Sequence, residues 1–379
     1  TMVDILQKLE FTVKAGAESI TVTAPTWRHD VTGPVDIAEE VSRIYGYDNI
    51  PSTRPVGPLH SGGTSRQTNL VDTARDLMTG FGFCETLSFS FSHPSFFEHL
   101  RLPADSPLRN AIPIMNPITD EFPILRTTLM AGLLDTVARN LSRKNEDLKI
   151  YEVGTTHHAL RLPLDTHPEE VYRLCGAMVG RRDGTEWCHS RDNVDFFDAK
   201  GTVESLLTGL GTSDWKVMES QAPWLHPGKQ ADFILGEVTV ATVGALHPSV
   251  QEAFGITRPV YLFKVNLTDL GPYCSVGAKA YSPLPKYPSI TRDMALVLPD
   301  SVPAAEVLTA VRNAGGELLV DSRLFDVYTG DRVEKGTRSL AIALVFRASD
   351  RTLTDEEVDA PMANLIQHME TKFAAKLRS

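Results

Sequence analysis

Two proline-rich segments constrain how this chain can fold, because proline lacks a backbone N–H and fixes its own φ angle. The first runs from Pro51 to Pro58 and continues to Gly62-Gly63, and the second is 281–288. Neither segment can form a regular helix or strand, so both predict linkers between folded segments. We therefore expect three segments, residues 1–58, 59–282 and 283–379.

Composition limits the class of protein. The 379 residues carry a net charge of −11, and each of the three segments holds more acidic than basic residues. Because phosphate contacts need clustered Lys and Arg, this balance argues against a dedicated nucleic-acid-binding protein. No apolar run reaches the roughly 18 residues that span a bilayer. The four cysteines are widely spaced and form no Cys-x-x-Cys pair, so we expect reduced thiols and a cytoplasmic location.

Four carboxylates in the first segment form the strongest chemical pattern of the chain. They are Asp30, Asp36, Glu39 and Glu40. The last three have the i, i+3, i+4 spacing of one helix face, and Pro34 suits the first position of that helix. Hard oxygen ligands gathered in this way suit Mg²⁺. The spacing alone also permits a solvated helix face, because the helix dipole favours acidic residues in the first turn.

The residues around these carboxylates carry a resemblance. Trp27–Asp30 is an aromatic-Arg-x-Asp turn, and Asp36–Pro51 reads DIAEEVSRIYGYDNIP. Both resemble, without a gap inside either motif, the B5 domain of the bacterial phenylalanyl-tRNA synthetase beta subunit family. The resemblance implies that the four carboxylates bind Mg²⁺, in a site shared with a partner alpha subunit.

The middle segment alternates helical and strand patterns. Its strands are joined by long and uneven helical insertions, which predicts an antiparallel sheet flanked by helices. The expected helices are 67–79, 127–143 and 198–210, and the expected strands are 84–91, 148–153, 231–235, 238–246 and 260–265.

Short phrases in this segment extend the resemblance. Phe196–Gly201, Leu225–Gly228 and Gly244–Pro248 stand in the order found in the catalytic-like module of the same subunit, which has a class II synthetase-like core. Class II synthetases hold ATP with two arginines, since arginine grips phosphate bidentately and lysine cannot. The strand Lys149–Gly154 contains Glu152 but no arginine. The resemblance therefore implies a core without an ATP site, in which Glu152 is structural.

Histidines 157, 158 and 167 lie near several acidic residues of the middle segment. A second metal site is one interpretation of this cluster. The spacing matches no common pattern of metal ligands, however, and we expect a solvated loop.

The last segment predicts a ferredoxin-like fold, because its elements read strand, helix, strand, strand, helix, strand. Apolar residues alternate from Leu340 to Phe346, as in a half-buried strand. Thr354–Glu357 forms a capping box that begins the last long helix. The other expected elements are strands 293–298 and 318–328 and a helix at 303–313.

Lys286–Leu296 and Phe325–Tyr328 resemble the ferredoxin-fold anticodon-binding domain of the same subunit. The residues we expect to contact RNA are Arg292, Tyr328 and Arg347. An aromatic and a cation on an open sheet face suit stacking on an unpaired base and contact with its phosphate. A solvated sheet with scattered polar groups remains the alternative for each of them.

The resemblance covers essentially the whole chain. It implies an α+β multidomain chain that is the non-catalytic, C-terminal part of a beta subunit in an α2β2 enzyme. That enzyme joins phenylalanine to tRNA-Phe with ATP and Mg²⁺, and ATP would bind elsewhere in the assembly. The first residues, TMVDILQKLEF, are typical of the inside of a domain, so we expect a piece of a longer protein. The alternatives are a stand-alone RNA- or partner-binding protein and an enzyme active alone, against which the missing arginines argue.

Overall fold

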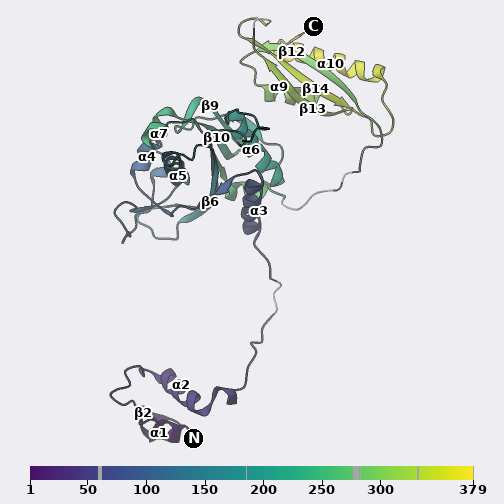
Figure 1. The fold of residues 1–379 in the computed structure, drawn as a ribbon. Helices are drawn as coiled ribbons and strands as arrows, with labels where there is room; N and C mark the ends of the chain where they lie inside the picture. The colour runs from purple at the N-terminus through teal and green to yellow at the C-terminus, as the bar shows by residue number, and fades with distance from the viewer. Residues whose placement is uncertain (59–61, 185, 276–280, 282, 331–332, 379) are drawn as a thin grey trace. The chain divides into compact units, whose positions relative to one another are not determined.

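The computed structural model describes residues 1–58, 62–184, 186–275, 281, 283–330 and 333–378 (Figure 1). The chain divides into two compact units, Thr1–Gly63 and Thr64–Ser379. The predicted ends of the middle segment, residues 59 and 282, lie outside the described residues. Within the described residues, no helix has the length and apolar character needed to cross a membrane.

The first unit is a small α+β arrangement built around one hairpin. Strands β1 and β2 pair antiparallel, with Thr12 opposite Thr23. Helix α2 begins at Pro34, as predicted, because the missing N–H of proline needs no partner at the first helical position. The elements in chain order are α1 (Met2–Lys8), β1 (Thr12–Ala15), β2 (Ile20–Thr23), α2 (Pro34–Tyr45) and the 3₁₀ turn η1 (Tyr47–Asn49).

The second unit contains a seven-stranded sheet with the order β3-β6-β7-β11-β10-β9-β8. Every pairing in it is antiparallel except that of β3 with β6. This is the antiparallel sheet expected for a class II synthetase-like core. Its strands are β3 (Cys84–Glu85), β6 (Leu148–His158), β7 (Glu169–Val179), β8 (Lys216–Glu219), β9 (Leu225–Leu235), β10 (Val238–Leu246) and β11 (Val260–Asn266).

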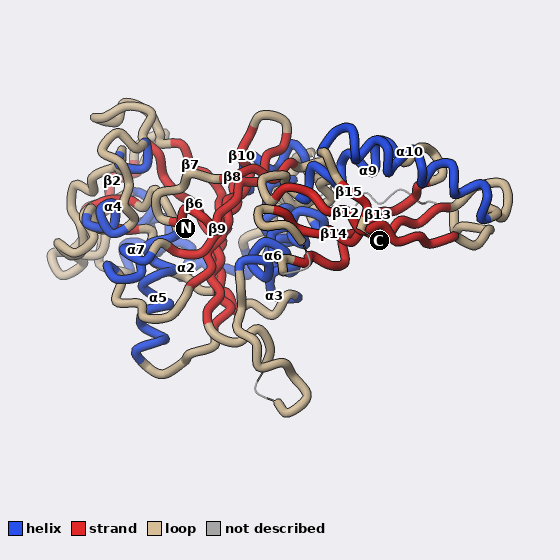
Figure 2. Tube along the Cα trace, turned by 90° about the horizontal axis from the view of Figure 1, so that it is seen from above, coloured by secondary structure: helices blue, strands red, loops and turns tan. Residues whose placement is uncertain are grey.

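Helices cover both faces of this sheet (Figure 2). Leu148 and Ile150 of β6 point toward the side of α4, α5 and α7, while Tyr151 and Val153 point toward α3 and α6. Alternate side chains of this one strand therefore pack into two separate hydrophobic cores, one on each face of the sheet. The remaining elements around the sheet are α3 (Arg66–Gly80), β4 (Phe91–Ser92), α4 (Ser95–His99), η2 (Pro107–Arg109), β5 (Ile124–Leu125), α5 (Met130–Ser142), α6 (Phe196–Gly209), α7 (Pro248–Ala253), α8 (Leu267–Leu270) and η3 (Gly271–Tyr273).

Several sequence-based expectations for this sheet are wrong, among them the start of β9, which begins at Leu225 and not at residue 231. The strand expected at 84–91 breaks after Glu85, because the Glu152 carboxylate accepts from Ser88 N–H and Ser88 Oγ–H. Strand β6 runs on to His158 instead of ending near Val153. His157 and His158 face Glu170 and Glu169 across the β6–β7 hairpin, so they lie in a sheet and not in a loop.

The C-terminal sheet has the order β13-β14-β12-β15 and is antiparallel throughout. The strand–helix order and this topology confirm the ferredoxin-like prediction. Leu340, Ile342, Leu344 and Phe346 are all buried, as their alternation predicted, and α9 and α10 lie along one face of the sheet (Figure 2). The elements are β12 (Ile290–Pro299), α9 (Ala304–Ala314), β13 (Leu319–Tyr328), β14 (Thr337–Phe346), α10 (Asp355–Phe373) and β15 (Lys376–Leu377).

Gly176, in the middle of β7, tests how tightly the core is packed. A Cβ at this position would lie 2.1 Å from the Phe263 ring. We expect Gly176→Ala to lower the free energy of unfolding by about 1–3 kcal/mol, the usual cost of overpacking. The matched control is Gly201→Ala in α6, where a Cβ meets nothing within 4 Å. Urea denaturation should show that the control is neutral or stabilising, and equal losses in both variants would contradict the packing argument.

Candidate functional site

The predicted carboxylates of the first unit lie on two local structures. Asp30 sits in the turn after β2, and the others lie on the first two turns of α2. Asp36 is the third residue of the helix, where its Oδ2 accepts from the backbone N–H groups of Thr32 and Gly33, both at 2.7 Å. Asp36 therefore caps the helix, and these two bonds lower its pKa. Glu39 is exposed on the helix surface.

Arg28 joins the turn to the helix. Its Nε donates to Asp30 Oδ1 at 2.9 Å, and its Nη2 donates to Asp30 Oδ2 at 2.6 Å and to Glu40 Oε1 at 2.7 Å. Arg43, one turn along α2, donates to the other oxygen of Glu40. Both oxygens of the buried Glu40 carboxylate are thus bonded to arginines. Sequence reasoning missed both arginines, although they lie inside the motif that located the carboxylates.

These contacts set the protonation of the site. The bonds from Arg28 lower the pKa of Asp30 to about 2 and also lower the pKa of Glu40. The same carboxylates raise the pKa of Arg28 well above its usual range. Asp30 and Glu40 are therefore ionised at neutral pH, with Arg28 as their counter-ion.

The four carboxylates have the right chemistry to bind Mg²⁺, but in this structure they are not arranged around a common metal position. All four side chains offer hard oxygen atoms, which Mg²⁺ prefers. In the part of the chain that the structure describes, however, no three or more His, Cys, Asp or Glu side chains are grouped closely enough to hold a metal ion. Among the residues that the structure describes, arginine bonds Asp30 and Glu40 but neither Asp36 nor Glu39. A metal could use the last two only after arginine moves.

A second polar cluster is buried in the core, at Glu152 of β6. Arg126, between β5 and α5, donates from Nη1 to Glu152 Oε1 at 2.6 Å and from Nε to the Thr155 carbonyl at 2.9 Å. Ser88 Oγ donates to the other carboxylate oxygen at 2.6 Å. Gly154 leaves room for this guanidinium, because a Cβ at that position would lie 2.3 Å from Arg126 Nη2 and would displace it. Glu152 is thus held in a structural ion pair, and the arginine that the local sequence lacks comes from 26 residues away.

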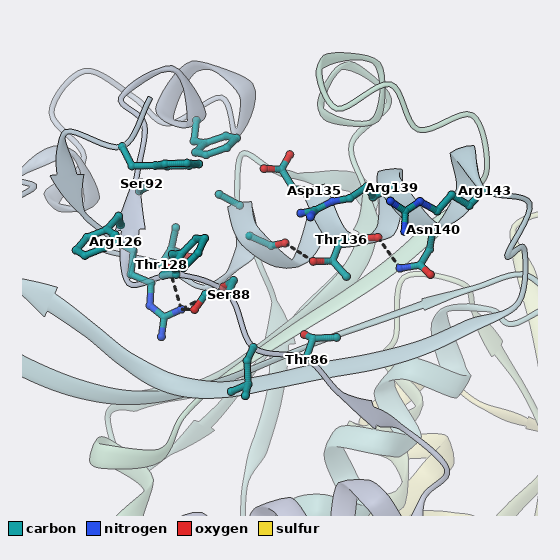
Figure 3. Close-up of a pocket in the computed structure, with 17 residues that line it drawn as sticks. Thr86, Ser88, Ser92, Arg126, Thr128, Asp135, Thr136, Arg139, Asn140 and Arg143 are labelled. Carbon is teal, nitrogen blue, oxygen red and sulfur yellow. Dashed lines mark hydrogen bonds between the residues drawn. The ribbon is translucent and has the colours of Figure 1, made fainter. Parts of the chain in front are cut away.

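Beside this cluster lies a cavity of about 580 Å³ (Figure 3). One wall is the segment from Thr86 to Phe91, in which Leu87 is 87% exposed and Phe89 is 73% exposed. The other wall is the polar face of α5. Burial raises the pKa of Asp135 on that face, and nearby Arg139 opposes the shift. The charged residues of this wall are Asp135, Arg139 and Arg143.

The expected RNA contacts of the C-terminal sheet lie in three different environments. Arg292 shares its face of β12 with buried Met294 and pairs with Asp355 at the start of α10. Arg347 follows β14, and its Nε is buried without a hydrogen-bond partner among the described residues. Tyr328 ends β13 opposite Ser339, on the face away from α9 and α10. The structure therefore does not bring the three together.

The sheet adds a residue that the sequence did not suggest. The Arg378 guanidinium lies 4.8 Å from the centroid of the Tyr328 ring. Its backbone N–H donates to the Ala295 carbonyl, next to the β12–β15 pairing. Tyr328 and Arg378 come from opposite edges of the sheet and meet across its open face, where the central strands carry small residues such as Ala295 and Ala341. No local pattern predicts such a contact between sheet edges.

Three family descriptions match this chain and show which class of protein it belongs to. In chain order, the family descriptions that match are the tRNA synthetase B5 domain (residues 1–47), the phenylalanyl tRNA synthetase beta chain CLM domain (50–267) and the ferredoxin-fold anticodon binding domain (285–378). These modules define a chain of the aminoacyl-tRNA synthetase class, and their order agrees with the folds described above. The chain belongs to the phenylalanyl-tRNA synthetase beta chain family.

Similar proteins carry the same description. A phenylalanine–tRNA ligase beta subunit of Symbiobacterium thermophilum is 40% identical over 362 residues, which are 95% of this chain and 40% of that protein. The corresponding subunit of Moorella thermoacetica is 36% identical over 380 residues, covering 100% of this chain and 46% of its own length. That of Clostridium tetani is 33% identical over 382 residues, with coverages of 100% and 46%. This chain spans less than half the length of each.

The buried ion pair of the core gives a sharp stability test. Arg126→Ala would leave the Glu152 carboxylate buried without its counter-ion, so we expect a loss of about 3–5 kcal/mol in the free energy of unfolding. The control is Arg75→Ala, which breaks the more exposed pair with Glu85 and should cost about 1 kcal/mol or less. Urea denaturation measures both, and a loss for Arg126→Ala no larger than that of the control would contradict the structural role of Glu152.

Proposed function

We propose that this chain is the non-catalytic, C-terminal part of the beta subunit of phenylalanine–tRNA ligase, the enzyme that charges tRNA-Phe with phenylalanine at the expense of ATP. The observation that carries the proposal is the order of three family matches along the chain, supported by a fold of the expected kind in each. In this assembly the chain serves docking to the alpha subunit and binding of the tRNA anticodon. The assembly would be an α2β2 heterotetramer in the cytoplasm.

The core contributes no chemistry of its own in this proposal. The Glu152 carboxylate forms an ion pair with Arg126 and accepts a hydrogen bond from Ser88. Each oxygen of this carboxylate is bonded to one of these groups, and the residue is 1% exposed, so Glu152 is not presented to a substrate. ATP would therefore bind to the alpha subunit.

The cavity beside α5 is the surface we propose for docking of the alpha subunit. Leu87 and Phe89 expose apolar surface at its edge, which single soluble chains seldom place together without a partner. The α5 wall presents two arginines against one carboxylate. An alpha-subunit segment with an apolar side chain followed by a carboxylate has the complementary chemistry.

The acidic site of the first unit is the second proposed link to the alpha subunit. Asp30, Asp36, Glu39 and Glu40 would supply this chain's part of a shared Mg²⁺ site. Two observations support it. Glu39 is exposed, and Asp36 is close enough to Asp30 for that charge to oppose the lowering of its pKa. Bound there, Mg²⁺ would neutralise carboxylates from both subunits.

The C-terminal sheet is the proposed anticodon-binding surface. Tyr328 offers a ring for stacking on an unpaired base, and Arg378 places a cation beside it. Arg292 and Arg347 are secondary candidates, because Asp355 already pairs with the first and the second is partly buried.

Mixing this chain with the alpha subunit of the same organism tests the proposal first. We expect light-scattering chromatography to show a complex that loosens when EDTA replaces Mg²⁺. Phe89→Ser should weaken assembly by about tenfold or more, as the loss of an interface anchor does, whereas Val56→Ser in the exposed linker should not. A complex indifferent to EDTA would contradict the metal link. No complex in either condition would favour the alternative, a stand-alone RNA- or partner-binding protein.

RNA binding is tested separately with the anticodon stem-loop of tRNA-Phe. Tyr328→Ala should lower the affinity for this stem-loop by about 5- to 150-fold, since one base–aromatic stack contributes about 1–3 kcal/mol. Tyr281→Ala, which removes an exposed linker tyrosine, is the control. Fluorescence anisotropy at one fixed salt concentration measures both, because salt alone shifts such affinities. Equal affinities for Tyr328→Ala and the control would remove Tyr328 from the site.

A further inference from the structure

The carboxylates proposed for Mg²⁺ already hold a cation in this chain, and that cation is an arginine. We infer that Arg28 is the built-in counter-ion of the acidic site, which neutralises Asp30 and Glu40 in the metal-free chain and must release them before a divalent cation can use their oxygens. The inference rests on the proposed metal site and assigns one further residue to control of its occupancy.

Arg28 and a metal ion cannot bind the same carboxylate oxygens at once, because one nitrogen of Arg28 already contacts both carboxylates. Arg28 Nη2 bonds Asp30 Oδ2 at 2.6 Å and Glu40 Oε1 at 2.7 Å. A metal that used both of these oxygens would need the space between them, which Nη2 occupies. Mg²⁺ takes its ligands at about 2.0–2.1 Å, so it cannot be added to this arrangement without moving Arg28.

Burial explains why an arginine stands there. The Glu40 side chain is 8% exposed, and a buried carboxylate without a partner is strongly unfavourable. The guanidinium of Arg28 is fixed from a third side by the Phe11 ring, 5.7 Å away. Arg28 therefore links Phe11, the residue before β1, with the turn and α2 without any metal.

Arg43 makes release of Arg28 feasible. It bonds the second oxygen of Glu40, so that Glu40 keeps one counter-ion after Arg28 leaves. Asp30 is exposed, with 64% of its side chain accessible, and solvent or metal can replace the arginine there. Among the described residues, no arginine bonds Asp36 or Glu39. Asp36 Oδ2 caps the helix, so Asp36 Oδ1 and the exposed Glu39 carboxylate are open to a first metal contact.

Mn²⁺ binding, followed by electron paramagnetic resonance of the free ion, tests the inference on the whole chain. We expect Arg28→Gln to bind Mn²⁺ about tenfold more tightly than the unaltered chain, because a competing cation contact is removed. The control is Lys14→Gln, an exposed residue of β1, which removes the same charge from the same unit. It should change the affinity by less than about twofold.

The outcomes distinguish failure of the proposed role of Arg28 from failure of the proposed metal site. Binding by the unaltered chain that Arg28→Gln leaves equal or weakens would overturn the role of Arg28 and leave the proposed metal site standing. Absence of Mn²⁺ binding in both proteins would overturn the metal site of this chain and the inference with it.

Folding is checked by thermal melts followed by circular dichroism. We expect the unaltered chain to melt at the same temperature in EDTA as in buffer, since Arg28 holds the site without metal. A marked loss of stability in EDTA would overturn the inference. If Arg28→Gln does not fold, Arg28→Lys replaces it. Lysine keeps the charge but lacks the planar fork with which Arg28 bonds Asp30 through two nitrogens and reaches Glu40 as well, and an unchanged Mn²⁺ affinity in that variant would overturn the inference.

Discussion

The buried ion pair between Arg126 and Glu152 is the interaction on which the core depends. It joins the segment before α5 to the central sheet, and Ser88 attaches the broken strand after β3 to the same carboxylate. The backbone of Arg126 continues the link, because its N–H donates to Ser90 and its carbonyl accepts from His157. One charged pair thus fixes three segments far apart in sequence. Its removal from water is tolerable only because each partner is bonded on more than one side.

Ion pairs between arginine and carboxylate also occur at the residues that the sequence predicts to bind metal or RNA. Glu40 is expected as a metal ligand, yet both of its oxygens are bonded to arginines. Arg292 is expected to contact RNA, yet it pairs with Asp355. Arginine suits these positions because its planar fork bonds carboxylates in several directions at once. In a chain with a net charge of −11, arginine pairs therefore decide which carboxylates and which cations remain available to partners.

Tyr328 and the cavity beside α5 carry most of the proposed function. The sequence proposes Tyr328 as a candidate, because it ends a strand in a motif that resembles a known domain. Arg378, its neighbour in space, was not found, because strand order and not sequence distance brings the two together. The cavity was missed for a related reason. The segment at 84–91 has the apolar content of a strand, but in the structure Ser88 bonds Glu152 and the side chains of Leu87 and Phe89 are exposed.

The sequence by itself determined the position of α2, the ferredoxin-like order of the last segment and the family. These features follow from local rules: proline at a helix start, alternation along a strand, and a capping box. The tertiary structure alone decided the length of β6, the partner of Glu152, and the contact of Arg28 with both Asp30 and Glu40. The reason is physical. Burial makes an unpaired charge costly, so each buried carboxylate needs a counter-ion. Which arginine pairs with it depends on how separate segments of the chain pack together, and a local sequence pattern cannot predict that.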